Sequence, residues 1–169
     1  MLDHYFIQIA KETFWDCALA LVSWGMGFAM TQDEISAIKE EIRSVYALPV
    51  RDFLEFIYRE RFPEDTSARV AFVLGHYNYF LNAVSRPPAE LNPHRESLMR
   101  LCIRFGVPAT VLEEVNQALV FELMKITAVQ RRNSPETMAA YGLVVALIAH
   151  GLFSSTDAAA QAPRRFRLG

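Results

Sequence analysis

This sequence contains little glycine and cysteine, and it lacks the dipeptides that form short β-hairpin turns. Its 169 residues include only seven glycines and two cysteines. There is no Asn-Gly or Asp-Gly dipeptide and no sustained alternation of apolar and polar residues, the patterns that indicate hairpins and strands. Two isolated cysteines give neither a disulfide framework nor a CxxC pair. The sequence therefore predicts an all-α protein in a reduced, cytoplasmic setting.

Long apolar runs and an excess of positive charge are missing too. The most apolar run, residues 17–30, has 14 residues, whereas a membrane-spanning helix needs about 20. The net charge is −2, so no basic field favours nucleic acid. We expect no membrane span and no nucleic-acid partner.

Motifs that build active sites are also absent. The sequence has no HExxH, no GxSxG, no phosphate-binding loop and no glycine fingerprint for dinucleotides. Its four histidines are scattered along the chain. The adjacent glutamates at 40–41 and 113–114 point to different helix faces. We therefore expect no enzymatic activity, no catalytic residue and no metal site.

The sequence is rich in apolar residues at helical spacing and in signals that start or stop helices. Apolar residues make up 52% of the chain and recur three and four positions apart. Thr31, Asn92 and Thr110 are the expected N-caps, and Gly106 followed by Pro108 is an expected stop. These signals predict about seven helices, near 5–24, 32–48, 51–62, 68–85, 92–105, 110–130 and 135–153. We expect one domain over 1–153, including an N-terminal extension at 1–30, and a flexible, Arg-containing tail at 154–169.

Set out in this order, residues 31–153 resemble the globin fold. An IxxIxxxI pattern, a proline corner and FLEFIYRERFPED are similar to the first two globin helices. FGVPATVLEEVNQAL is similar to the corner and long helix that follow the haem-bearing helix. SPETMAAYGLVVALIAHGLF is similar to the terminal helix. The resemblance implies a globin-like bundle with an extra N-terminal helix.

The histidine that binds haem iron in globins is missing at the matching place. It normally lies shortly before the Gly-Val-Pro corner, where this chain has Leu101, Cys102, Ile103 and Arg104. The resemblance therefore implies a haem-free relative. A gas-binding haem globin with an unusual axial ligand, such as a Cys102 thiolate, stays an alternative.

Two haem-free groups are similar to this chain. Phycobiliproteins carry a helical extension, a Tyr-Tyr-Leu motif similar to 79–81 and a Leu-Gly-Val-Pro corner similar to 105–108. Their bilin-bonding cysteine has no counterpart at 73–76. This likeness implies a non-covalent open-chain tetrapyrrole, a biliverdin-like bilin, as in globins associated with bilin biosynthesis. The haem-free globin domains of bacterial stress sensors fit equally well, and imply a dimeric sensor or interaction module without a small ligand.

A bilin needs a flat apolar slot, a polar group for its pyrrole nitrogens and cations for its propionates. The residues expected to bind it are His76, Tyr77, Asn78, Phe80, Arg95, Leu101, Cys102, Phe105 and Tyr141. The alternative is that these side chains simply fill the core, with His76 hydrogen-bonded inside it. Trp15, Trp24 and Phe28 in the extension favour an interface. We therefore expect a homodimer through the terminal helices, or a partner protein on that surface.

Overall fold

A computed structural model describes the backbone over residues 30–131 and 134–166, and side chains over 30–130 and 134–153. The predicted helix at 5–24 and the aromatic residues of the extension lie outside the described residues. Over the described ranges the chain forms helices and no strand, which confirms the all-α prediction. The helices are α2 (Gln32–Val45), α3 (Ala47–Arg61), α4 (Thr66–Ser85), α5 (Asn92–Phe105), α6 (Thr110–Arg131) and α7 (Pro135–Phe166), with a 3-10 turn η2 at Pro88–Glu90.

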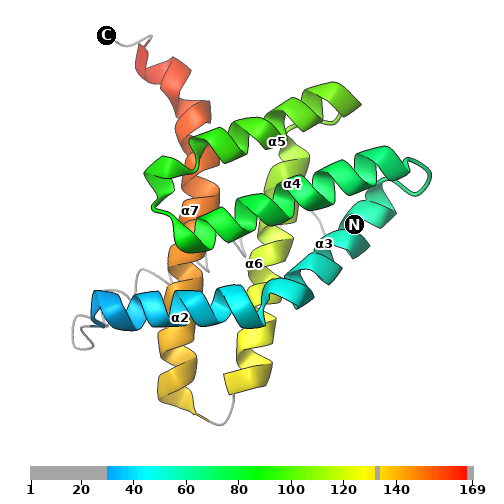
Figure 1. Cartoon of the computed structure of the whole chain (residues 1–169). Coiled ribbons are helices and arrows are strands. Elements are labelled where there is room, and N and C mark those ends of the chain that lie inside the picture. Colours follow the sequence, from blue (N-terminus) through cyan, green and yellow to red (C-terminus); the bar gives the residue numbers. More distant parts are fainter. Residues whose placement is uncertain (1–29, 132–133, 167–169) are drawn as a thin grey trace.

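Two long helices, α6 and α7, lie side by side, and α2, α4 and α5 cross this pair (Figure 1). Helix α4 has the central position, because it contacts α2, α3, α5 and α7. Helix α3 packs against α4 and α6. The largest fully buried side chains include Tyr46, Tyr58, Tyr79, Phe72 and Phe80.

Some helix boundaries follow the sequence signals. The Thr31 hydroxyl accepts a hydrogen bond from the Glu34 amide at 3.2 Å, as expected of an N-cap. Helix α5 ends at Gly106, which adopts the left-handed conformation at φ 65° and ψ 34°. Among the described glycines it alone has a positive φ. A residue with a Cβ atom would be strained there.

Two predicted caps and the predicted corner at Pro49 are wrong. Asn92 is the first residue of α5 rather than its cap, and no side chain caps that helix. Thr110 likewise belongs to α6, where the amides of Val111 and Leu112 bond to backbone carbonyls instead. Helix α2 ends at Val45, earlier than predicted, and Pro49 lies in the first turn of α3. Proline is tolerated there because first-turn amides have no partner within the helix.

Buried tyrosine hydroxyls connect helices that are distant in sequence. Tyr46 bonds to Thr127 on α6 at 2.7 Å, and Tyr79 on α4 donates to the Leu152 carbonyl on α7 at 2.9 Å. Tyr141 on α7 donates to Glu41 on α2. Because buried polar groups are costly unless they are paired, these bonds favour one particular helix arrangement.

The last helix is unusually apolar. Among the described residues its segment Pro135–Phe153 is the one long and apolar enough to span a bilayer, with a mean hydropathy of 1.5. Half of that window is buried inside the bundle, as in a core helix packed on several sides. The absence of a membrane span therefore stays a prediction. Beyond the apolar stripe the backbone continues as helix to Phe166, where the sequence predicts a flexible tail from Ser154.

Candidate functional site

Three buried polar side chains from three helices form one hydrogen-bonded chain. The Tyr58 hydroxyl on α3 lies 2.8 Å from Nδ1 of His76 on α4. The other ring nitrogen of His76, Nε2, lies 2.7 Å from Oδ1 of Asn116 on α6. None of the three side chains is more than 1% exposed. Since Asn116 Oδ1 can only accept, Nε2 of His76 carries the proton and Nδ1 accepts from Tyr58.

Burial controls the protonation of these three hydrogen-bonded side chains. Removal from water lowers the pKa of His76 to about 4, and the hydrogen bond to Asn116 offsets this only in part. The imidazole is therefore neutral at neutral pH. Burial also raises the pKa of Tyr58 far above its usual range, with the nearby Cys102 adding to the rise and the Arg61 cation opposing it. The phenol therefore stays a hydrogen-bond donor to His76.

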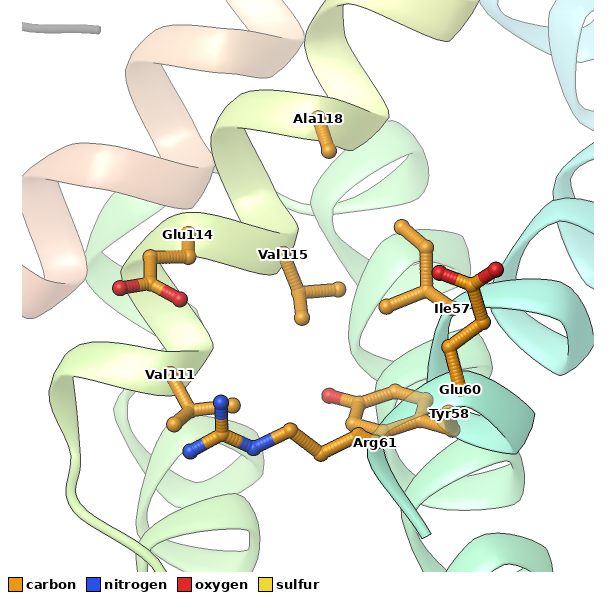
Figure 2. Close-up of a pocket in the computed structure, with 8 residues that line it drawn as sticks. All are labelled: Ile57, Tyr58, Glu60, Arg61, Val111, Glu114, Val115 and Ala118. Atoms are coloured by element: carbon orange, nitrogen blue, oxygen red, sulfur yellow. The ribbon is translucent and has the colours of Figure 1, made fainter. Parts of the chain in front are cut away.

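A cleft of about 290 Å³ opens between α3 and α6, beside the three hydrogen-bonded side chains. Tyr58 takes part in both features, because it lines the cleft and bonds to His76. The remaining lining residues come from the second half of α3 and the first half of α6. They are Ile57, Glu60 and Arg61 on α3, and Val111, Glu114, Val115 and Ala118 on α6 (Figure 2).

The charged groups of the cleft lie at its exposed rim. In Figure 2 the Arg61 side chain extends from α3 toward Val111 on α6, with Glu114 on the same side of the view. Glu60 stands on the opposite side. Within the described part of the chain, none of these three charges forms an ion pair; the ion pairs lie elsewhere, on α3, α5 and between α4 and η2. The cleft thus combines an apolar wall with free charges of both signs.

The structure brings together only some of the residues expected to bind a bilin. His76 is close to Tyr79 and Tyr58, and Cys102 is near enough to Tyr58 to influence its pKa. Phe105 contacts Phe72, with 5.9 Å between ring centroids. His76, Phe80, Cys102 and Tyr141 are buried, Tyr77, Arg95, Leu101 and Phe105 are half-buried, and Asn78 is exposed.

Two of the expected residues point to separate places. The Asn78 side chain accepts from Asn82 one helical turn later, on the exposed side of α4. Tyr141 donates a hydrogen bond to Glu41 on α2. Arg95 is half-buried on α5, and its buried Nε atom has no hydrogen-bond partner among the described residues.

Helices α4 and α5 pack directly together where the resemblance places the tetrapyrrole. A Cβ atom added to Gly75 would lie 3.0 Å from Leu101 Cδ1 and 3.2 Å from Leu98 Cδ2. The neighbouring His76 is enclosed and bonded at both ring nitrogens. Burial raises the pKa of the Cys102 thiol, which disfavours the thiolate needed as a metal ligand. No group of three metal-binding side chains occurs among the described residues.

The sequence contained signals for the residues that were missed. Asn116 is a polar residue within the apolar stripe of α6, and its burial requires a hydrogen-bond partner. Tyr58 lies among the apolar residues of the segment FLEFIYRERF, but no local pattern indicates its partner 18 residues later. Arg61 and Glu114 have the pattern of ordinary surface charges, and only the fold shows that they flank one cleft.

No family model, curated protein or solved structure matches this chain.

Proposed function

We propose that this chain is a haem-free, globin-like binding module that takes a small, non-covalent ligand in the cleft between α3 and α6. One observation carries this proposal: Tyr58 lines the cleft and is bonded to His76 at 2.8 Å. A ligand that displaces Tyr58 therefore acts on α4 through His76 and on α6 through Asn116. Such a connection between a cleft and three helices suits a sensor.

The globin-like part of the proposal is supported by the helix packing. Three helices cross the α6–α7 pair, as in a bundle packed at steep angles rather than in parallel. The left-handed Gly106 ends α5 just before the long helix α6. This order agrees with the resemblance of the corner segment to globins.

The haem-free part is supported by the surroundings of His76. Both of its ring nitrogens already have partners, so it offers no free lone pair to iron. A bilin at the place given by the resemblance would require α4 and α5 to separate at Gly75, where Leu101 is in close contact. A smaller ligand in the open cleft needs no such rearrangement.

Absorption spectra test the haem-free assignment. Purified protein is titrated with hemin and, separately, with biliverdin. We expect neither a stoichiometric Soret band nor a saturable red absorption. A 1:1 hemin complex that is lost in His76→Ala would overturn the assignment. A 1:1 biliverdin complex that is lost in the same variant would place the ligand between α4 and α5 instead.

The fluorescent probe anilinonaphthalene sulfonate tests the cleft itself. It combines an apolar ring system with an anion that suits Arg61. We expect Ala118→Phe, which fills the cleft, to abolish its saturable binding. Ala128→Phe places the same ring on an exposed position of the same helix and serves as the control. Equal binding by both variants would contradict a ligand site in the cleft.

A second function, as a dimeric interaction module, is favoured by the exposed apolar side chains of α6 and α7. Phe121, Met124 and Leu147 are 50%, 39% and 39% exposed. Such residues are commonly covered in an assembly. Light scattering on the purified chain tests this: a dimer that Phe121→Lys converts to monomer supports the module, and a wild-type monomer at high concentration removes it.

A further inference from the structure

We propose that the ligand of the α3–α6 cleft is a small zwitterion with an apolar side chain, the chemistry of a free apolar α-amino acid. This inference rests on the proposed function, because it names the ligand class of the same cleft. It is drawn from the signs and positions of the three rim charges, the apolar lining and the size of the cleft.

The cation of the cleft suits a carboxylate. The Arg61 guanidinium extends across the cleft (Figure 2), and no acidic oxygen of the described residues lies within ion-pair distance of it. Its planar group binds a carboxylate through two parallel hydrogen bonds. A ligand carboxylate is therefore expected to occupy this end of the cleft.

The acidic residues of the cleft indicate that the ligand also carries a positive charge. Glu114 lies on the same side of the cleft as Arg61 in Figure 2, and Glu60 stands opposite. With one cation and two carboxylates, the rim repels a dianion such as phosphate and attracts an ammonium group. In an α-amino acid the ammonium and carboxylate are bonded to one carbon, so one such ligand can face both Glu114 and Arg61, which line the same cleft.

The wall and volume of the cleft set the size of the ligand. Ile57, Val111, Val115 and Ala118 supply the apolar surface. A volume of about 290 Å³ is at the low end of ligand pockets, which run from about 300 to 1,000 Å³. A single aliphatic side chain fits such a wall, and a tetrapyrrole does not.

Three probes of one shape separate the contributions of the two charges. The full-length protein, labelled with ¹⁵N, is titrated with L-leucine, with 4-methylpentanoate and with 3-methylbutylamine. The last two lack the amine and the carboxylate, respectively. We expect saturable shifts of the Val115 and Ala118 amides with leucine, and binding weaker by about two- to fivefold with each truncated probe, the size of one exposed ion pair. If 4-methylpentanoate binds as tightly as leucine, the ligand is a plain carboxylate and the inference of a zwitterion is wrong.

Variants then test the assigned contacts. Arg61→Gln and Glu114→Gln are each expected to weaken leucine binding by about two- to fivefold, whereas Arg59→Gln, an exposed change on the same helix, leaves it unchanged. Unchanged affinity in Arg61→Gln overturns the inference.

If the fluorescent probe occupies the cleft and leucine does not, the ligand class is wrong and the proposed function stands. If Ala118→Phe leaves probe binding intact, the proposed function itself fails.

Discussion

The Tyr58 hydroxyl and Nδ1 of His76 are 2.8 Å apart, although 18 residues separate them in the chain. This bond joins α3 to α4, and the second ring nitrogen of His76 extends the connection to Asn116 on α6. A histidine fixed in this way holds three helices together. Its neutral form is required, because charging it inside the core is costly.

Lowering the pH is expected to destabilise the fold through His76. Its pKa of about 4 in the folded protein lies below the usual 6.5, so the unfolded chain binds more protons between these two pH values. Stability therefore falls as the pH drops from about 6.5 to 4, by about 2 kcal/mol between pH 7 and pH 5. Urea unfolding at both pH values measures this. His76→Gln is the control, since it should remove that part of the pH dependence and leave the contribution of the other groups.

Removing the Tyr58 hydroxyl should weaken the fold. Tyr58→Phe leaves Nδ1 of His76 buried and unpaired, which is expected to lower the free energy of unfolding by about 1–3 kcal/mol. Tyr77→Phe is the matched change on α4, because Tyr77 is half-buried and its hydroxyl makes no hydrogen bond within the described residues. Its expected effect is within about 0.5 kcal/mol. Equal losses in the two variants would mean that the bond to His76 contributes nothing.

Two helical glycines should respond differently to alanine. At Gly142 an added Cβ meets nothing within 4 Å, so Gly142→Ala should stabilise by about 0.5–1 kcal/mol through helix propensity. At Gly75 the same Cβ meets Leu101 at 3.0 Å. We expect Gly75→Ala to be less stable than Gly142→Ala by about 1–3 kcal/mol. Thermal unfolding of both variants checks this, and equal stabilities would contradict the direct packing of α4 on α5.

The bond between Tyr46 and Thr127 should also be measurable. The hydroxyl of Thr127 donates to the Leu123 carbonyl at 2.9 Å and so accepts from Tyr46 at 2.7 Å. Thr127→Val is expected to destabilise by about 0.5–1.5 kcal/mol, because it removes the hydrogen bond that Thr127 accepts from the buried Tyr46 hydroxyl. In the Tyr46→Phe variant, Thr127→Val should lower the free energy of unfolding by less. Additive losses in the double variant would refute the bond.

The sequence predicted the helical class and most helix positions, because apolar spacing and the Gly106 stop are local signals. It placed caps less well, since Asn92 and Thr110 compete with backbone partners that only the surrounding turns determine. His76 was identified as a candidate site residue with a core alternative. The sequence could not reveal its bonds to Tyr58 and Asn116, as these depend on how α3 and α6 pack against α4.

The cleft was not predicted at all. Its charged residues come from two helices about 50 residues apart in the chain, and surface charges at helical spacing carry no signal of a shared cavity. The expected bilin residues depended on a resemblance. In the structure the place which that resemblance indicates is occupied by the contact of Gly75 with Leu98 and Leu101.

The most direct test of the account is the protonation state of His76, followed by long-range ¹H–¹⁵N correlation spectra of the imidazole ring from pH 8 to pH 5. The buried hydrogen bonds predict one neutral tautomer, protonated at Nε2 and unprotonated at Nδ1, that persists over this range. A ring that titrates with a midpoint near 6.5, or that exchanges between tautomers, would contradict the buried connection to Tyr58 and Asn116.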